Sequence, residues 1–426
     1  CDRYTTVQDW IISEWTFVIT ITWPTLKLVL QATQNDPPAN AMARIWKVYI
    51  FHYHTDFYGP VPYFQAGTGL LSIPYDAQKD IYDDFFKQLD TAVAALKAAD
   101  QAVTPYGNND LIFHGSIPLW TKFANSLRLR LAMRVSYVEP DLAKSEAEKA
   151  VADGVMTDLS DNAFMDVSEA SPNGLNQMAP WEGYRMSATM ESYLKGYNDP
   201  RMAEYWSPAA DGNYHSLRNG LTAAQLGADS RNSLDNTSNI GPRYQIDDQY
   251  TNKLTVMYAA ESYFLRAEGA LNGWNMGGTA KDFYEQGITT SLQQWGVTDN
   301  AVIQQYINGT SAPVALNDYL NSPAVAGIPV KFGTDAGTQL QQIITQKWLA
   351  LFPDGIEAWA ELRRTGYPKI YSVANSDNPD VPAEQVMRRF NFLNYEYQTN
   401  RAAVESAIPL LNGPDKASTH LWWDVR

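Results

Sequence analysis

The stretch QKWLALFPDGIEAWAELRRTGYP, residues 346–368, contains the end of one helix and the whole of the next. Asp354 can cap the second helix, because its carboxylate accepts a hydrogen bond from the backbone N–H groups that a helix start leaves unpaired. Gly366 suits the left-handed position that follows a helix, and Pro368 prevents the helix from continuing. The stretch therefore predicts two consecutive helices joined by a short turn.

Two adjacent arginines, Arg363 and Arg364, fall in the last turn of the second helix. Cations are favoured at a helix C-terminus, whereas anionic ligands prefer the N-terminus. We therefore expect both arginines to cap the helix or to pair with acidic residues of the irregular segments, and not to hold an anionic ligand. The large apolar residues of the stretch are expected to pack in the core: Trp348, Leu351, Trp359 and Leu362.

The same pattern of two helices separated by a turn occurs earlier in the chain as well. The predicted helix pairs are 40–99, 118–154, 254–296 and 337–366. In the first pair, residues with helical spacing form the expected core face: Met42, Ile45, Trp46, Tyr49 and Tyr53, then Ile81, Phe85, Leu89, Ala92 and Leu96. Ala280 and Tyr284 fit the second helix of a tetratricopeptide repeat. An isolated repeat cannot bury its apolar face, so we expect the pairs to stack.

The fold class predicted by this pattern is mainly α, with helix pairs that carry irregular inserts. The prediction is a single domain over 1–426, with a scaffold at about 40–154, 254–296 and 337–366 and inserts at 157–250 and 366–426, the first insert holding a short helix near 187–196. Binding residues usually lie on loops that a rigid scaffold positions. The inserts are therefore the predicted location of the site.

Composition excludes several classes of function. The 426 residues carry a formal net charge of −15, which disfavours nucleic acids and anionic membrane surfaces because both need a cationic partner. The longest apolar run, residues 15–23, is too short to span a bilayer. Cys1 is the single cysteine, so an intrachain disulfide cannot form. It is either a lipid-bearing first residue or the start of a fragment, and we favour the fragment.

Catalytic and metal-binding patterns are missing from the sequence. His52 and His54 lie two residues apart, point to different sides of a helix, and are expected to pack in the core. Motifs for nucleotides, zinc or an activated nucleophile do not occur, so we predict no catalytic residues, no metal and no cofactor. The acidic loop 375–384 does not have the spacing of a calcium loop. A glycoside hydrolase with two unplaced carboxylates remains the alternative, because such an enzyme needs little else.

The first insert is rich in aromatic and amide residues, which stack on sugar rings or hydrogen-bond to hydroxyl and peptide groups. We predict that the ligand-binding residues are Asn173, Asn176, Trp181, Tyr184, Arg185, Trp206 and Tyr214, in segments too rich in Pro and Gly for helix. The competing interpretation is that Trp181 and Trp206 only fasten the insert to the helices.

Several segments carry a family resemblance. Residues 346–368 resemble the C-terminal helix pair of the SusD/RagB outer-membrane lipoproteins of Bacteroidetes, in the branch called SusD-like 2. Further elements occur in that family's order: NAMARIWKVYIFHYHTDFYGPVPY (40–63), IYDDFFKQLDTAVAAL (81–96), WTKFANSLRLRLAMRVS (120–136), NDPRM (198–202), FYEQGITTSLQQWG (283–296) and LWWD (421–424).

The resemblance implies a cell-surface nutrient-binding subunit and not an enzyme. Such proteins have four tetratricopeptide-like helix pairs and an irregular ligand-binding part. They are lipid-anchored at the extracellular face of the outer membrane, where they deliver oligosaccharides or peptides to a SusC-like TonB-dependent transporter. The chain departs from the family pattern at its start, because Cys1 comes sooner than a lipid-bearing cysteine normally would.

Overall fold

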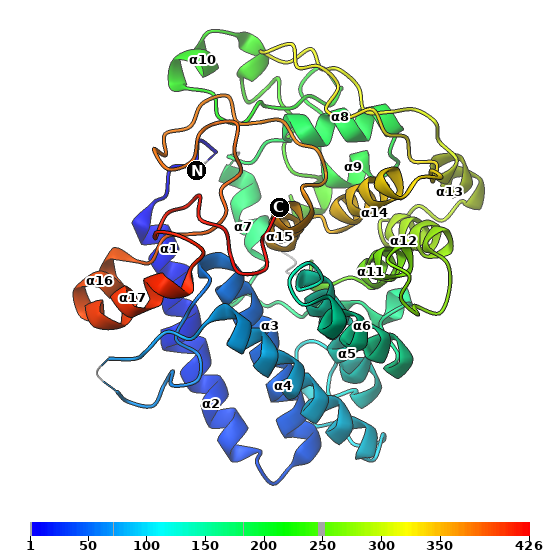
Figure 1. Ribbon diagram of the computed structural model, residues 1–426. Helices are drawn as coiled ribbons and strands as arrows, with labels where there is room; N and C mark the ends of the chain where they lie inside the picture. The colour runs from blue at the N-terminus through cyan, green and yellow to red at the C-terminus, as the bar shows by residue number, and fades with distance from the viewer. Residues whose placement is uncertain (1, 71, 182, 246–251) are drawn as a thin grey trace. The chain divides into compact units, whose positions relative to one another are not determined.

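The computed structural model describes residues 2–70, 72–181, 183–245 and 252–426 (Figure 1). It is mainly helical, which confirms the predicted fold class. By its contacts the chain divides into two compact units: unit 1 comprises Arg3–Met156 and Asn378–Arg426, and unit 2 comprises Thr157–Asp377. The domain boundaries given above stay a prediction, and the role of Cys1 lies outside the described residues.

Unit 1 contains the first two predicted helix pairs. Its elements are α1 (Gln8–Trp15), η1 (Thr16–Thr22, a π-helix), α2 (Trp23–Ala32), α3 (Pro37–Tyr58), α4 (Gln78–Ala98), η2 (Gly107–Asn109), α5 (Ile117–Arg134), α6 (Pro140–Asp153), α16 (Asn394–Thr399), α17 (Arg401–Ala407) and η7 (Ile408–Leu410). Helices α3 and α4 contact one another, α5 contacts α6, and α4 contacts α5. The two pairs of this unit therefore stack as expected.

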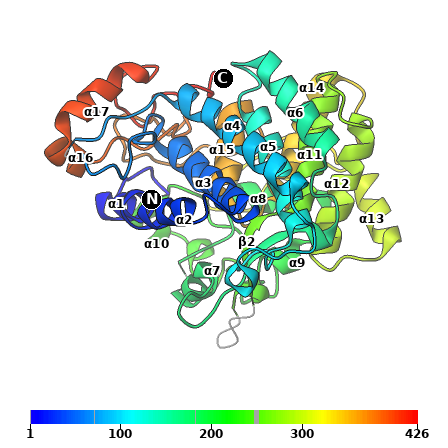
Figure 2. The same cartoon turned by 90° about the horizontal axis from the view of Figure 1, so that it is seen from below.

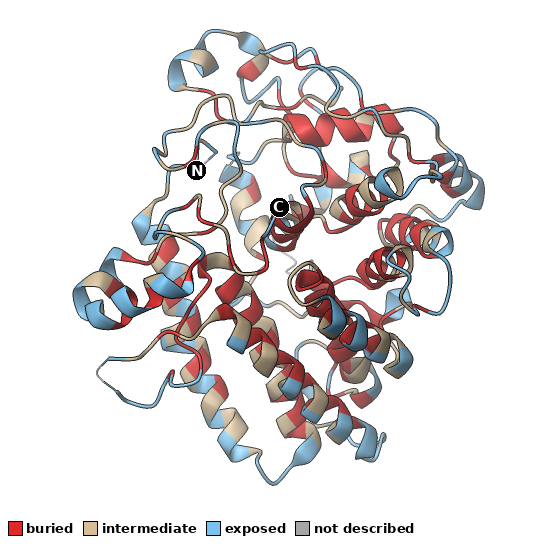
Figure 3. Ribbon diagram, in the orientation of Figure 1, coloured by how far each residue is buried: buried red, intermediate tan, exposed pale blue. Residues whose placement is uncertain are grey.

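Helix α3 begins where Asp36 caps it and ends at Gly59, whose φ of +85° no longer continues a helix. Its core face differs from the predicted stripe. Ile45 is fully buried, but Trp46, Tyr49 and Tyr53 are only half-buried. The reason is that α3 packs against α2, α4 and α5 together, so buried residues occupy a broader part of its surface than one stripe (Figure 3). The face predicted for α4 is buried at every position.

Asp56 is the buried polar centre of unit 1. Its Oδ1 accepts hydrogen bonds from Tyr82 Oη at 2.7 Å and from Trp423 Nε1 at 2.8 Å. Its Oδ2 lies 3.4 Å from the Arg134 guanidinium. Asp56 is 1% exposed, so these donors replace the water that the carboxylate would otherwise bind. They join α3, α4 and α5 to the last residues of the chain.

Unit 2 contains the other two helix pairs and the first insert. Its elements are η3 (Leu159–Asp161), β1 (Ala163–Met165), α7 (Gly174–Met178), η4 (Ala179–Trp181), α8 (Ala188–Tyr197), α9 (Met202–Tyr205), α10 (Ala223–Gly227), η5 (Ser230–Asn232), η6 (Pro242–Tyr244), β2 (Leu254–Met257), α11 (Ala259–Leu271), α12 (Ala280–Gln294), α13 (Asn300–Ile307), α14 (Ala336–Ala350) and α15 (Gly355–Thr365). Helices α11 and α12 lie side by side (Figure 2), and α14 contacts both.

The prediction that the third pair starts with a helix at residue 254 is wrong. Residues Leu254–Met257 form β2, which pairs antiparallel with β1. Helix α11 begins only at Ala259, whose backbone N–H donates to the Asn162 side chain at 2.7 Å. Strand pairing and this cap are made by residues far away in the sequence, so they override the local helical spacing.

The short helix predicted near 187–196 is present as α8. Ser187 caps it by accepting a hydrogen bond from the backbone N–H of Met190 at 3.2 Å. Nearly all of α8 is buried (Figure 3), although it belongs to the insert. Further short helices, among them α7 and α17, also fall inside the predicted inserts.

Buried ionic groups connect helices α11, α14 and α15. Lys347 of α14 is 1% exposed and its Nζ lies 3.6 Å from Glu261, 3.5 Å from Glu357 and 3.2 Å from Glu361. Arg364 of α15 forms paired hydrogen bonds to Glu268 at 2.7 and 2.6 Å, and bonds to Glu361 at 2.9 and 2.7 Å. Burial alone would lower the pKa of Arg364, but Glu268 and Glu361 raise it well above its usual value.

These contacts answer the question raised by the two arginines. Asp354 caps α15 by accepting from Glu357 N at 3.1 Å, and Gly366 ends it with a φ of +73°, both as predicted. For Arg364, the expectation of pairing with acidic residues of the inserts is wrong. Arg364 pairs with carboxylates of helices α11 and α15, and Arg363 stacks on Trp359 with its guanidinium carbon 3.5 Å from the ring centre. Both arginines are core residues, because carboxylates neutralise the charge of Arg364 and the Trp359 ring covers the guanidinium plane of Arg363.

We predict that Arg364→Met lowers the free energy of unfolding by about 3–5 kcal/mol, because Glu268 and Glu361 lose a buried cationic partner. Urea unfolding followed by tryptophan fluorescence measures the change.

The matched control is Arg401→Met. Arg401 pairs with Glu405 at 2.9 Å, but its side chain is 71% exposed. The control should cost less than about 1 kcal/mol, because water solvates both groups. Equal losses in the two variants would show that the buried pairing does not stabilise unit 2.

Candidate functional site

Several of the predicted site residues contact one segment of unit 2, residues 238–243, which is extended up to Gly241 and then enters η6; we call it the central segment. Arg185 pairs with Asn239 and Trp206 pairs with Ile240, each through an isolated antiparallel bridge. Backbone pairing of this kind holds side chains of separate loops at defined positions. The central segment therefore pairs with two separate loops of the insert, as a strand pairs with its neighbours.

Helix α7 is fastened to the central segment and to residues 252–253 by amide side chains. Asn176 Nδ2 donates to the Arg243 carbonyl at 3.4 Å, and Asn176 Oδ1 accepts from Asn252 Nδ2 at 2.8 Å. Asn173 caps α7 by accepting from Leu175 N at 3.0 Å. The capping explains why this segment contains a helix, contrary to the expectation drawn from its Pro and Gly content.

The central segment passes very close to α9, and this approach requires a glycine. Gly241 N donates to the Tyr205 carbonyl at 2.8 Å. A Cβ atom on Gly241 would lie 2.1 Å from the Glu204 carbonyl oxygen, which is far inside van der Waals contact. Only glycine allows the two backbones to come this close.

Trp181 and Tyr184 are the most exposed of the predicted site residues. Trp181 at the end of η4 is 71% exposed and Tyr184 is 43% exposed. Tyr184 Oη donates to the sulfur of Met178 at 2.9 Å, so its ring stands beside α7. We call these two side chains the aromatic surface. An exposed indole offers a flat apolar face on which a ligand can stack.

The other predicted residues are less exposed. Trp206 is 8% exposed, and its ring centre lies 5.5 Å from that of Phe352. Asn173 is 4% exposed, and its Nδ2 donates to the carbonyls of residues 252 and 253. Asn176, Arg185 and Tyr214 are half-buried. In this structure Asn173 and Trp206 hold the insert together.

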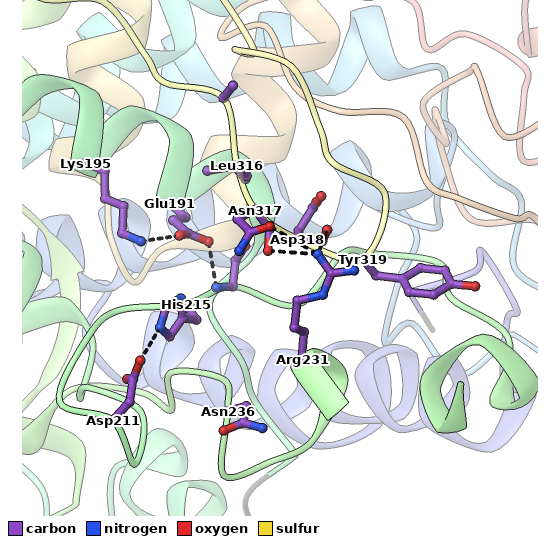
Figure 4. Close-up of a pocket in the computed structure, with 12 residues that line it drawn as sticks. Glu191, Lys195, Asp211, His215, Arg231, Asn236, Leu316, Asn317, Asp318 and Tyr319 are labelled. Atoms are coloured by element: carbon purple, nitrogen blue, oxygen red, sulfur yellow. Dashed lines mark hydrogen bonds and ion pairs between the residues drawn. The ribbon is translucent and has the colours of Figure 1, made fainter. Parts of the chain in front are cut away.

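A cavity of about 450 Å³ lies in the same unit and was not predicted (Figure 4). It is lined by Glu191 and Lys195 of α8 and by residues from 211–216, 231–236 and 315–319. We call it the polar cavity, because charged and amide side chains form much of its wall. It adjoins the central segment, since Ser238 N donates to the His215 carbonyl at 2.7 Å and His215 N donates to Ser238 Oγ at 3.0 Å.

Two carboxylates of the polar cavity are held by defined donors. Glu191 is 5% exposed, pairs with Lys195 one turn later in α8, and accepts from Ser216 N at 2.7 Å. Asp211 accepts from His215 Nε2 at 2.8 Å. The hydrogen bond from His215, with further ones from Asn213, lowers the pKa of Asp211 to about 2.

Sequence reasoning missed the polar cavity because its residues come from four separate segments. The one local signal is the spacing of Glu191 and Lys195, which lie four residues apart on a helix and favour an ion pair. Such pairs are common on any helix, so the spacing does not indicate a site.

Asp211 of the polar cavity does not have the property that a general acid needs. A glycosidase needs one carboxylic acid with a raised pKa to protonate the leaving group. The pKa of Asp211 is shifted in the opposite direction. Among the described residues there is also no group of three or more His, Cys, Asp and Glu side chains placed to hold a metal ion.

Comparison with known proteins gives a consistent result. A family model described as SusD-like, Susd and RagB outer membrane lipoprotein, matches residues 1–424. A chitin-binding SusD homologue from Flavobacterium johnsoniae is 37% identical, with a TM-score of 0.91 over 100% of this chain and 89% of that one. A SusD homologue from Bacteroides thetaiotaomicron is 34% identical, with a TM-score of 0.89 and the same coverage.

A third solved structure, described as a chitin-binding protein, is 30% identical with a TM-score of 0.83, over 100% of this chain and 90% of that one. Among curated proteins no match was found.

We predict that His215→Ala raises the pKa of Asp211 from about 2 toward the ordinary carboxyl value of 3.8, because the largest stabilising hydrogen bond to the carboxylate is lost. The lowered pKa favours the folded state above the ordinary carboxyl pKa, and this contribution disappears as the pH falls toward 2. Titration of the carboxyl carbon by NMR measures the shift.

Asp229 provides the internal control for this titration. Its pKa is lowered by a hydrogen bond from Arg231, so it should not respond to the loss of His215. An Asp211 titration that is the same in both proteins would contradict the assigned cause.

Proposed function

Because the chain belongs to the SusD/RagB family of outer-membrane lipoproteins, we propose that it captures glycans at the cell surface through the aromatic surface of Trp181 and Tyr184. The observation that carries this proposal is the 71% exposure of Trp181 on a segment that is fastened by polar contacts. The C–H groups of a sugar ring can stack on the exposed face of such a tryptophan.

The polar contacts around the aromatic surface hold its backbone in place before a ligand arrives. Asn173 caps α7, Asn176 is bonded to Asn252, and the Ala179 carbonyl accepts from Asn239 Nδ2 at 3.5 Å. A surface that is already ordered loses less conformational entropy on binding. The aromatic surface therefore depends on these amide contacts for its position.

Oligomers of N-acetylglucosamine are the first ligands to test. Two of the similar solved structures are described as chitin-binding, at 37% and 30% identity to this chain. Peptides are the second class, because aromatic and amide side chains also bind peptide groups. A panel that contains both classes decides between them.

We further propose that the chain delivers its ligand to a SusC-like TonB-dependent transporter and is held at the outer membrane by a lipid anchor. The family description as outer membrane lipoproteins supports the anchor. Within the described residues, the structure contains no helix with the length and apolarity to cross a bilayer. Isolation from native outer membranes with a co-purifying barrel protein of the transporter class tests this part.

A binding subunit should release no product from its ligand. Incubation of the purified chain with chitin oligosaccharides, followed by chromatography of the sugars, tests the alternative that it is a glycoside hydrolase. Steady accumulation of shorter sugars would overturn the non-catalytic assignment.

We predict that Trp181→Ala together with Tyr184→Ala weakens binding of N-acetylglucosamine oligomers by about 100-fold, as expected when stacking on two aromatic faces is lost at roughly tenfold each. The midpoint of thermal unfolding should stay nearly unchanged, because both side chains are exposed. Isothermal titration calorimetry and thermal denaturation measure the two quantities.

The matched control replaces an exposed tryptophan and tyrosine of unit 1. Trp10 is 67% exposed and Tyr395 is 53% exposed, and their joint replacement by Ala should leave the affinity unchanged. If the control weakens binding as much as the test variant, or if the test variant keeps full affinity, the aromatic surface is not the site.

A further inference from the structure

Most of the charged side chains that line the polar cavity have an oppositely charged partner, and the carboxylate of Asp318 accepts hydrogen bonds from Ser322 N at 2.8 Å and from Ser322 Oγ at 2.6 Å. Lys195 pairs with Glu191, His215 with Asp211 at 2.8 Å, and Arg231 with Asp229 at 2.7 Å (Figure 4 shows the first two pairs). An ionic ligand would have to displace one of these partners in order to form an ion pair of its own. A neutral ligand can use the hydrogen-bonding capacity that each pair leaves over.

Two groups of the cavity retain such capacity. Lys195 carries three N–H donors, its side chain is 34% exposed, and its pairing with Glu191 occupies one donor. The carboxylate of Asp211 has about four acceptor positions, and hydrogen bonds from His215 Nε2, Asn213 N and Asn213 Nδ2 leave about one of them open on a side chain that is 49% exposed. The wall therefore presents a donor and an acceptor, which is the combination that a sugar hydroxyl matches because it both donates and accepts.

Ser216 adds a buried hydroxyl without a partner. The residue lines the cavity and is 6% exposed, and its Oγ makes no hydrogen bond to the described residues. Its backbone N–H is already used by Glu191. Buried hydroxyl groups are normally hydrogen-bonded, and an unsatisfied one is destabilising. Because the Oγ atom itself is almost inaccessible, it reaches a hydroxyl or carbonyl group of an occupant only after the Ser216 side chain rotates into the cavity.

The size of the cavity sets the length of this occupant. A volume of about 450 Å³ falls within the range of small-molecule sites. The space suits a short saccharide and not a long glycan chain. The lining residues also do not include Trp181 or Tyr184, so the cavity is separate from the aromatic surface.

We propose that the polar cavity is a second saccharide site, which recognises a short neutral saccharide by a hydrogen bond donated from Lys195, one accepted by Asp211 and one formed with the Ser216 hydroxyl. The aromatic surface acts by stacking, whereas the cavity acts by polar recognition of hydroxyl groups. This inference rests on the proposed function for its choice of ligand class, but it concerns different residues and can fail independently.

The test uses the full chain with Trp181→Ala and Tyr184→Ala, so that stacking no longer contributes. The probes are neutral N,N′-diacetylchitobiose, its cationic fully deacetylated form, and anionic digalacturonate, each measured by calorimetry. The neutral probe is expected to bind at least about tenfold more tightly than either ion. Adding Lys195→Gln should then weaken binding of the neutral probe about tenfold, as expected for one charge-assisted hydrogen bond.

The control is Lys281→Gln. Lys281 forms the same kind of pair with Glu285 four residues later on α12, outside the cavity, and its loss should leave the affinity unchanged. Because Lys195→Gln removes the partner of the buried Glu191, Ser216→Ala serves as a second variant that changes no charge. It should weaken binding several-fold without lowering the thermal midpoint.

The outcomes separate the two proposals. If the unmodified chain binds the neutral probe and the aromatic double variant loses all binding, the aromatic surface stands and the cavity proposal is overturned. If binding survives the double variant and is weakened further by Lys195→Gln or Ser216→Ala, the cavity is the site. Three results would each overturn the cavity proposal: tighter binding of either ion, an affinity that neither Lys195→Gln nor Ser216→Ala changes, or no binding of the neutral probe to the unmodified chain.

Discussion

The arrangement of the helices in unit 2 depends on two buried cations, which pair with carboxylates of neighbouring helices. Lys347 and Arg364 are at most 1% exposed, and every carboxylate around them comes from α11 or α15. A slide of α15 by one turn would move Arg364 by about 5.4 Å and leave Glu268 without its partner. Apolar side chains would tolerate such a slide far better, because dispersion contacts have no fixed partner. The network therefore determines the register of the helices as well as their proximity.

The insert is ordered by a different means. It contributes few long helices, and its loops are joined by single bridges and amide bonds to the central segment. Gly241 lets that segment lie against the backbone of α9, because a Cβ atom at this position would collide with the Glu204 carbonyl. The aromatic surface and the polar cavity both adjoin this segment. A few backbone contacts of this segment therefore determine the positions of the residues in the aromatic surface and in the polar cavity.

The helical part of the fold was predictable because its signals are local. Spacing along α4 and the cap at Asp354 depend on residues within a few positions, and both agree with the structure. The partner of Arg364 was not predictable, since Glu268 lies 96 residues away along the chain. Strand β2 was mistaken for helix for the same reason, because β1 pairs with it from residues 163–165.

The candidate site was predictable only as a region. Composition identified Trp181 and Trp206 equally, yet one is 71% and the other 8% exposed. This difference arises from packing against Phe352, which no local pattern reveals. The polar cavity gave even less signal, since its wall is assembled from segments that meet only in the folded unit.

Unit 1 is made of two pieces of chain, Arg3–Met156 and Asn378–Arg426, and Asp56 is hydrogen-bonded to Trp423 across 367 residues. During synthesis the first piece is complete long before the second exists, so Asp56 has Tyr82 and Arg134 as partners early and gains the Trp423 donor almost last. Contacts of such high sequence separation slow folding. In a nascent or truncated chain the Asp56 centre lacks its Trp423 donor, so unit 1 completes its polar core only when the C-terminal piece docks.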